Sequence, residues 1–245
     1  MSGHLNPGGQ QFRDDNGAAD PRVAAALAGY QAGRESEQAA LTALATARLL
    51  VPVVAVLADG PAADGAADGD KNSEMVLPTL IGRDGRPAVL AFTGLDALAR
   101  WRPDARPVPA EAGRVWRAAV ADGCAVVIDV AGPVPLAVEG ARLGTLAAGQ
   151  PVPPAHEDPD VRAEVEAAVA GEPLIAGFSL AAGRAAQTAD GAGDTDATDL
   201  AVRLHLAAGD WQPVVNYVAN SVAARLAGRL RRGVEFTVTS DPIGS

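Results

Sequence analysis

A chain of 245 residues is long enough to bury the core of one large domain, or of two domains of ordinary size. The formal net charge of -10 at pH 7 creates a surface field that repels phosphate backbones and anionic lipid, so nucleic acid and membrane surfaces are not expected partners. Hydrophobic residues make up 48% of the chain and aromatic residues only 4%, which predicts a globular protein with aliphatic cores.

Three features bear on the cellular compartment. Cys124 is the single cysteine, so the chain can form no internal disulfide. The opening residues, Met-Ser-Gly-His-Leu-Asn, have neither the basic nor the apolar region of a secretory signal peptide. Asp129 interrupts the longest apolar stretch, 125–138, which is shorter than the roughly 18 to 20 residues that a membrane helix needs. We therefore expect a cytoplasmic protein with no membrane segment.

The chain begins with a polar stretch, residues 1–20, which shows no periodicity and is expected to be a disordered tail. Pro21 then marks the first position of a helix, because apolar residues follow it at helical spacing. A second helix is expected over 35–50 and the first strand over 51–57. A loop rich in glycine and aspartate follows at 59–72.

The strongest local pattern predicts a β-hairpin. Two apolar strands, 74–82 and 87–92, are joined by Arg83-Asp84-Gly85-Arg86, and Asp-Gly between apolar runs is typical of a tight hairpin turn. The rest of the first half is expected to contain helices at 95–101 and 111–122, strands at 125–130 and 134–138, and a short helix at 142–148.

The second half is marked off by Pro151, Pro153 and Pro154. Prolines can continue neither a helix nor a central strand, so residues 150–157 are predicted to be a linker. Asp158 is predicted to cap a helix that begins at Pro159 and stops before Gly171. The elements expected after it are strands at 173–181 and 199–207, a long helix at 211–232 and a last strand at 234–239.

This interleaving of strands and amphipathic helices predicts an α/β (α+β) protein of two small domains, each a mixed β-sheet packed with helices. The expected division is a tail at 1–20, a domain at 21–149, the linker at 150–157, a second domain at 158–240 and a tail at 241–245. A distant internal duplication of the two halves stays open.

One pattern resembles a nucleophile elbow. Ser179 lies in Gly177-Phe-Ser-Leu-Ala181, and Asp194 and His205 follow in the order of an α/β-hydrolase triad. That mechanism needs a tight strand-to-helix turn, whereas a loop rich in glycine and aspartate follows Ser179. We therefore predict no catalytic site.

The metal and cofactor patterns are incomplete. Residues 68–74 begin like a calcium loop, but Ser73 stands at the glycine position and Thr79 at the glutamate position, so a solvated acidic loop is predicted. The histidines are dispersed along the chain, and no glycine cluster has the spacing of a nucleotide-binding loop. The sequence predicts no cofactor and no metal site. The histidines are His4, His156 and His205.

Exposed tryptophan and arginine are the remaining candidates for function, because both are over-represented at interface hot spots. The predicted partner-binding residues are Phe92, Arg100, Trp101 and Arg102. Trp116 and Trp211 lie on apolar helix stripes and are predicted to be core residues. Four arginines at the end of the helix at 211–232 are interpreted as complements of the helix macrodipole, with the binding of an anion as the alternative. These arginines are Arg225, Arg229, Arg231 and Arg232.

Residues 51–148 resemble the amino-terminal domain of the SseB family, whose name refers to enhanced serine sensitivity. The resemblance rests on a series of short segments and not on one motif, and Val130-Ala131-Gly132-Pro133 replaces the asparagine-proline that is usual in the family. The segments are Val51-Pro-Val-Val, Leu77-Pro78-Thr79-Leu80 before Asp84-Gly85-Arg86, Ala91-Phe92-Thr93 before Leu95-Asp96-Ala97-Leu98, Trp101 with Pro103-Asp104 and Arg106-Pro107-Val108, and 125–129 before Gly132-Pro133.

The second half is similar to the carboxy-terminal domain that often accompanies this family. The resemblance implies a fold but no particular activity or catalytic residue. We therefore expect a non-catalytic, cytoplasmic protein-binding or scaffolding protein. Its expected partner is another protein, and a homo-oligomer is also compatible with the sequence. The alternative is a small-molecule sensor or enzyme linked to amino-acid metabolism, which the serine-linked family name suggests.

Overall fold

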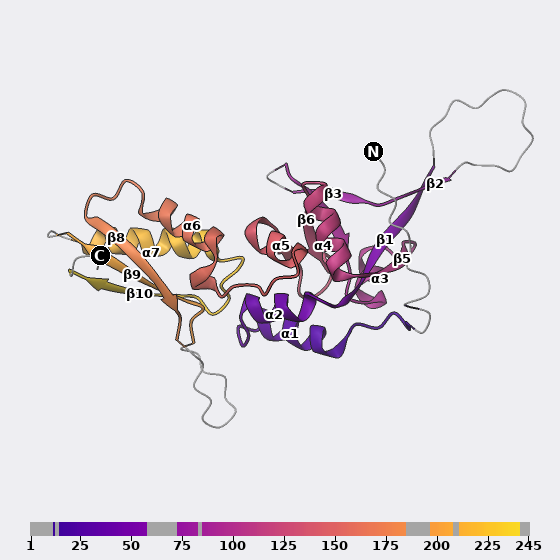
Figure 1. Cartoon of the computed structure of the whole chain (residues 1–245), viewed down its shortest axis with the longest axis horizontal. Helices are drawn as coiled ribbons and strands as arrows, with labels where there is room; N and C mark the ends of the chain where they lie inside the picture. The colour runs from indigo at the N-terminus through magenta and orange to yellow at the C-terminus, as the bar shows by residue number, and fades with distance from the viewer. Residues whose placement is uncertain are drawn as a thin grey trace, which may run out of the picture. The chain divides into compact units, whose positions relative to one another are not determined.

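Helices and strands alternate along the chain in a mixed α/β fold, as predicted (Figure 1). The structure is a computed structural model, and it describes residues 12, 15–57, 73–82, 85–184, 197–207 and 211–240. Contacts divide the chain into two units, each of which is described by itself. The N-terminal unit comprises Met1–Ala24, Ala45–Glu139 and Leu146–Gly149, and the C-terminal unit comprises Ala25–Leu44, Gly140–Thr145 and Gln150–Ser245.

This division groups 25–44 and 140–145 with the later part of the chain, whereas the sequence predicted one domain over 21–149. Residues 150–157, predicted to be a linker, contain a short 3-10 helix, η1 (Ala155–Glu157). They also contain the buried Val152, whose carbonyl accepts a hydrogen bond of 2.9 Å from Nε2 of Gln38. The domain boundary itself stays a prediction.

A four-stranded sheet of the N-terminal unit has the order β3-β4-β6-β7. Parallel strands β4 and β6 lie at its centre, and β3 and β7 pair antiparallel at its edges. The predicted hairpin is confirmed for its inner part, since β3 pairs antiparallel with β4 and the Gly82 N–H donates to the Arg86 carbonyl at 2.8 Å. The single strand predicted over 74–82 is divided, because residues 73–76 pair with β1 (Arg48–Leu57) in another sheet. The strands are β3 (Thr79–Ile81), β4 (Pro87–Ala91), β6 (Ala125–Ile128) and β7 (Leu136–Val138).

A second, three-stranded sheet of the same unit has the order β2-β1-β5 and is antiparallel throughout. Its strands are β1 (Arg48–Leu57), β2 (Ser73–Val76) and β5 (Arg106–Glu111). Strand β5, which contains Pro107 and Pro109, was not predicted from the sequence. Proline lacks the N–H that a central strand needs, so it is found in edge strands, and β5 is at the edge of this sheet.

Aliphatic side chains fill the N-terminal unit, with two aromatic rings among them. The predicted helices α3 (Leu95–Trp101) and α4 (Ala112–Ala121) are confirmed. Trp116 of α4 is fully buried, which confirms it as a core residue. One buried cluster draws on β1, β4 and α3; its members are Leu50, Val54, Leu90, Phe92, Ala97, Leu98 and Ala105.

Residues 15–20, predicted to be part of a disordered tail, make specific polar contacts in the N-terminal unit. Asp15 Oδ2 lies 2.7 Å from Nε of Arg48, and the Gly17 carbonyl accepts a hydrogen bond of 2.8 Å from the Leu95 N–H. The composition of this stretch did not reveal these partners because they lie far away in the sequence. The remainder of the predicted tail, residues 1–11 and 13–14, lies outside the described residues.

The first two helices are α1 (Pro21–Gln31) and α2 (Glu37–Leu44). The prediction that the second helix continues to residue 50 is wrong, because the chain turns after Leu44 and β1 begins at Arg48. Residues 49–51 are all buried, and such a continuous apolar run fits a buried strand and a buried helix equally well.

The C-terminal unit contains a three-stranded sheet of order β10-β9-β8, with β9 parallel to β10 and antiparallel to β8. Figure 1 shows α6 and α7 on one face of this sheet. Alternate residues of β9 form the core beneath them, namely Leu200, Val202 and Leu204. The elements are α6 (Pro159–Val169), β8 (Ile175–Ala182), β9 (Leu200–Leu206), α7 (Gln212–Leu226) and β10 (Val234–Thr239).

The remaining outcomes concern helices and their ends. The Asp158 cap is confirmed, because its Oδ1 accepts hydrogen bonds from the Asp160 and Val161 N–H groups. The prediction of a core position for Trp211 is wrong: α7 begins only at Gln212, and Trp211 is 37% exposed. The short helix predicted at 142–148 is α5 (Gly140–Ala147). No helix in the described part of the chain has the length and apolarity needed to span a bilayer.

Candidate functional site

The residues that resemble a nucleophile elbow do not form one. Ser179 lies in the middle of β8, exposed and opposite Arg203 of β9. His205 lies opposite Gly177 in the same strand pair, and Asp194 is outside the described residues. A serine within a strand lacks the strand-to-helix turn that exposes the nucleophile in an α/β-hydrolase.

The other sequence patterns also stay apart. His156 lies in η1, with its Nε2 3.5 Å from Oε1 of Glu157, while His4 and the acidic loop at 68–72 are outside the described residues. Among the residues that are described, no group of three or more His, Cys, Asp and Glu side chains could hold a metal ion. Burial and the charge of Asp122 both raise the pKa of the Cys124 thiol, which disfavours the reactive thiolate.

The four predicted partner-binding residues belong to the N-terminal unit, and they differ in how far their side chains are exposed. Phe92 is fully buried and its ring centroid lies 5.5 Å from that of Trp101. Its side chain has no surface to offer a partner, so the prediction for Phe92 is corrected. Arg100 and Arg102 are exposed on either side of the half-buried Trp101, and Nε of Arg102 lies 3.0 Å from Oδ1 of Asp104.

A pocket of about 300 Å³ in the C-terminal unit is the candidate site. Its walls come from the start of α2, the segment around η1, the end of β8, the start of β9 and the chain after α7. The size lies at the lower end of the range for small-molecule sites. The lining residues are Ser36, Glu37, Gln38, Val152, Pro153, Pro154, Ala155, His156, Asp158, Ala182, Gly183, Arg184, Thr198, Asp199, Arg229, Leu230 and Arg232.

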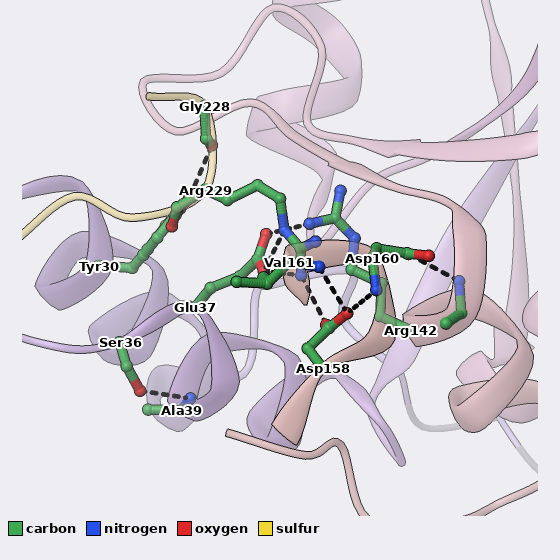
Figure 2. Close-up of polar contacts among 11 residues, drawn as sticks. Tyr30, Ser36, Glu37, Ala39, Arg142, Asp158, Asp160, Val161, Gly228 and Arg229 are labelled. Carbon is green, nitrogen blue, oxygen red and sulfur yellow. Dashed lines mark hydrogen bonds and ion pairs between the residues drawn. The ribbon is translucent and has the colours of Figure 1, made fainter. Parts of the chain in front are cut away.

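Arg229 is the central cation of the pocket wall. Figure 2 shows its guanidinium between the carboxylates of Glu37 and Asp158. Its Nε and Nη2 each lie 3.1 Å from Oε2 of Glu37, and Nη2 also lies 2.7 Å from Oδ2 of Asp158. The other oxygen of Glu37 accepts a hydrogen bond of 2.5 Å from Nη1 of the buried Arg142. Two carboxylates and two guanidiniums therefore form one network, which we call the Arg229 network.

The surroundings of Arg229 favour its charged form. Burial acts to lower the pKa of Arg229, but the nearby carboxylates of Glu37 and Asp158 outweigh it and raise the pKa above its ordinary value. Tyr30 stands next to the network and donates its hydroxyl to the carbonyls of Gly228 and Arg229, at 2.9 and 3.0 Å (Figure 2). Burial raises the pKa of Tyr30, as does the charge of Glu37.

Two more ion pairs complete the charged wall. Asp199 accepts from the Arg232 N–H at 2.9 Å and from Nε of Arg232 at 2.7 Å. Arg184 is more exposed, and its Nη2 lies 3.1 Å from Oε2 of Glu235. Every carboxylate oxygen of the pocket lining thus accepts a hydrogen bond. The oxygens of Glu37 accept from Arg142 and Arg229, and those of Asp158 accept from Arg229 and the first N–H groups of α6. The oxygens of Asp199 accept from Arg232.

Comparison with known proteins identifies the family. The family model described as the SseB protein N-terminal domain matches residues 23–145. The chain belongs to the SseB family. Neither the curated proteins nor the solved structures contain a match to the chain.

The site of this SseB-family chain lies mostly beyond the matched segment. Of the lining residues, only Ser36, Glu37 and Gln38 fall within 23–145, as does Arg142, which pairs with Glu37. Arg229 and Arg232 were recognisable in the sequence as cations near a helix end, but their carboxylate partners were not. The structure places both residues after the end of α7 at Leu226, where each is paired with buried acids.

Proposed function

We propose that this SseB-family protein is a non-catalytic binding protein, and that the pocket of its C-terminal unit takes up a small polar molecule. The observation that carries the proposal is the combination of a pocket of metabolite size with buried, ionised walls. This is the small-molecule sensor that the sequence left as the alternative. We further propose that it acts in the cytoplasm.

Binding without turnover is supported by the state of the acids in the pocket. A general base needs a carboxylate lone pair that is available to take a proton from the substrate. Glu37, Asp158 and Asp199 instead have their oxygens held by guanidinium and backbone N–H groups. Such groups position a ligand and set the local field.

The experiment is a thermal-shift panel on the full chain, with amino acids including serine, organic acids, sugars and nucleosides as ligands. A ligand present at 100 times its dissociation constant should raise the unfolding free energy by about 2.7 kcal/mol. Ala182→Phe fills the pocket from an exposed position of β8, and Ala181→Phe makes the same change at the neighbouring exposed position, which does not line the pocket.

We expect the shift in the wild type and in Ala181→Phe, and its loss in Ala182→Phe. A panel in which no compound shifts the wild type would reject the proposal. So would a shift that Ala182→Phe retains in full, because the ligand would then be bound elsewhere.

A second candidate is the protein-binding or scaffolding role that the sequence favoured, through Arg100, Trp101 and Arg102. Two exposed arginines that directly precede and follow Trp101 in the sequence favour it, because arginine and tryptophan recur at interface hot spots. Affinity capture with the full chain tests it, with a second copy of the chain as one possible partner. The double variant Arg100→Ala with Arg102→Ala should lose the captured partner, and a partner retained by that variant would exclude this surface.

A further inference from the structure

We propose that the ligand of the pocket is a small organic anion, a carboxylate with a short apolar body, bound by the guanidiniums of Arg184, Arg229 and Arg232. This inference rests on the proposed function and names the chemical class of the molecule. It follows from a count of the donors and acceptors that the pocket has already used.

The carboxylate oxygens of the pocket all accept hydrogen bonds from groups of the protein itself. Oε1 and Oε2 of Glu37 accept from Arg142 and Arg229, and Oδ1 and Oδ2 of Asp158 accept from the first turn of α6 and from Arg229. Both oxygens of Asp199 accept from Arg232. A ligand ammonium group would have to share these oxygens with buried guanidinium and N–H donors that already face them, and its positive charge would lie close to the guanidiniums.

The donors are not all in use. Nε and Nη2 of Arg229 donate to Glu37 and Asp158, and Nε of Arg232 donates to Asp199. Among the described residues, no hydrogen bond uses Nη1 of Arg229, either η nitrogen of Arg232, or Nε and Nη1 of Arg184. Guanidinium N–H groups match the two oxygens of a carboxylate in geometry and charge, so these donors favour an oxyanion.

The apolar part of the lining points to an organic ion. Two prolines, two alanines and two larger aliphatic side chains contribute to the same walls. They offer no hydrogen bond to a fully hydrated inorganic ion, but they can take hydrocarbon out of water. These residues are Val152, Pro153, Pro154, Ala155, Ala182 and Leu230.

The test is an NMR titration of the full chain with three organic probes of similar size and different charge, and with one inorganic anion. The probes are butyrate, its neutral amide butyramide, the zwitterion 2-aminobutyrate and inorganic phosphate. We expect butyrate to bind at least about tenfold more tightly than each of the other three, since a single charge-assisted hydrogen bond is worth that factor or more.

Two arginine variants make a matched pair for the same titration. Arg184 lines the pocket and its side chain is 56% exposed, and Arg225 is 43% exposed and does not line it. Each pairs with one glutamate, so Arg184→Gln and Arg225→Gln remove the same charge from similar settings. Butyrate binding should weaken about tenfold in Arg184→Gln and less than about twofold in Arg225→Gln.

The outcomes separate this inference from the proposed function. Binding of 2-aminobutyrate or butyramide as tightly as butyrate, or an Arg184→Gln variant that binds butyrate like the wild type, would overturn the anion while leaving a binding pocket in place. Phosphate binding as tight as that of butyrate would overturn the organic class. If none of these probes binds and the thermal-shift panel is also flat, both proposals fail.

Discussion

Tyr30 is a buried side chain whose hydroxyl lies within hydrogen-bond distance of two carbonyls after α7, those of Gly228 and Arg229. Its ring is fully buried, and the guanidinium of Arg231 lies 5.4 Å from the ring centroid. Tyr30→Phe keeps the ring and removes the donor to Gly228 and Arg229. We expect the free energy of unfolding to fall by about 0.5–1.5 kcal/mol, as for the loss of one hydrogen bond. Urea denaturation measures the change.

Tyr217 is the matched control for this prediction, because its side chain is 60% exposed on α7. Tyr217→Phe should change the unfolding free energy by less than about 0.5 kcal/mol. Equal effects of the two substitutions would show that the Tyr30 hydrogen bonds contribute nothing specific.

Asp129 is a buried acid with an unusual backbone at the end of β6. Its φ of 48° lies in the left-handed region, and its oxygens accept from the Thr93 N–H at 2.8 Å and the Thr93 hydroxyl at 2.7 Å. Burial raises the pKa of this carboxyl, against the opposing effects of the Thr93 hydrogen bonds and the charge of Arg100. The folded protein therefore holds the Asp129 proton more tightly than the unfolded chain does.

The sign of the pH effect follows from linkage. A raised folded-state pKa contributes stability below the unfolded-state value, near pH 4, and that stability is lost as pH rises through the folded-state pKa. Asparagine tolerates the left-handed backbone, and its amide can accept from the Thr93 N–H and donate to the Thr93 hydroxyl. Asp129→Asn should therefore be at least as stable as the wild type at pH 7, with a smaller fall in stability between pH 4 and pH 7.

Urea unfolding of the wild type and Asp129→Asn at several pH values in this interval checks the prediction. A variant that loses more than about 1 kcal/mol at pH 7 would show that the ionised carboxylate is worth more to the fold than its burial costs.

Helix α6 is tied to the Arg229 network through Asp158 at its start. One oxygen caps the helix and the other accepts from Arg229. Asp158→Ala should lower the unfolding free energy by about 3 kcal/mol or more, because it removes a cap and breaks a buried ion pair. Asp158→Asn keeps a capping oxygen and should fall between this variant and the wild type in urea denaturation.

Asp20 provides the comparison for a cap alone, since its exposed Oδ1 accepts from the Arg22 N–H at the start of α1. Asp20→Ala should cost about 1 kcal/mol. If Asp158→Ala costs no more than Asp20→Ala, the ion pair with Arg229 adds nothing to stability.

Most helices and strands were predictable from local patterns, and the exceptions have local causes. The hairpin of β3 and β4 and the cap of α6 were predicted because the decisive residues lie within a few positions of each other. Strand β5 was missed because two prolines in six residues are atypical of a strand, and only its place at the sheet edge makes them acceptable.

The site was much less predictable than the fold. Glu37 is 105 residues from Arg142 and 192 from Arg229, and Arg229 is 71 from Asp158. No spacing rule connects residues at such separations, and each arginine by itself is typical of a solvated helix end. The aromatic and arginine positions near residue 101 were visible because they are neighbours in sequence, although the burial of Phe92 was not.

The pocket residues all belong to the C-terminal unit. A bound carboxylate should therefore stabilise the elements of that unit directly. Hydrogen exchange of the full chain with and without saturating butyrate should show slower exchange in β9 and α7, and a smaller change in β4 and β6. Uniform protection of all four elements would contradict a site confined to this unit.

The prolines of β5 also bear on how the chain avoids unwanted assembly. Pro107 lies directly opposite Pro52, and since neither has an N–H, the two residues form a pair without hydrogen bonds, with their backbone groups facing away from each other. Pro109, two residues on, faces the same outward side. The outer edge of β5 therefore lacks amide donors that an approaching strand from another molecule would need, and this edge of the sheet disfavours edge-to-edge pairing between molecules.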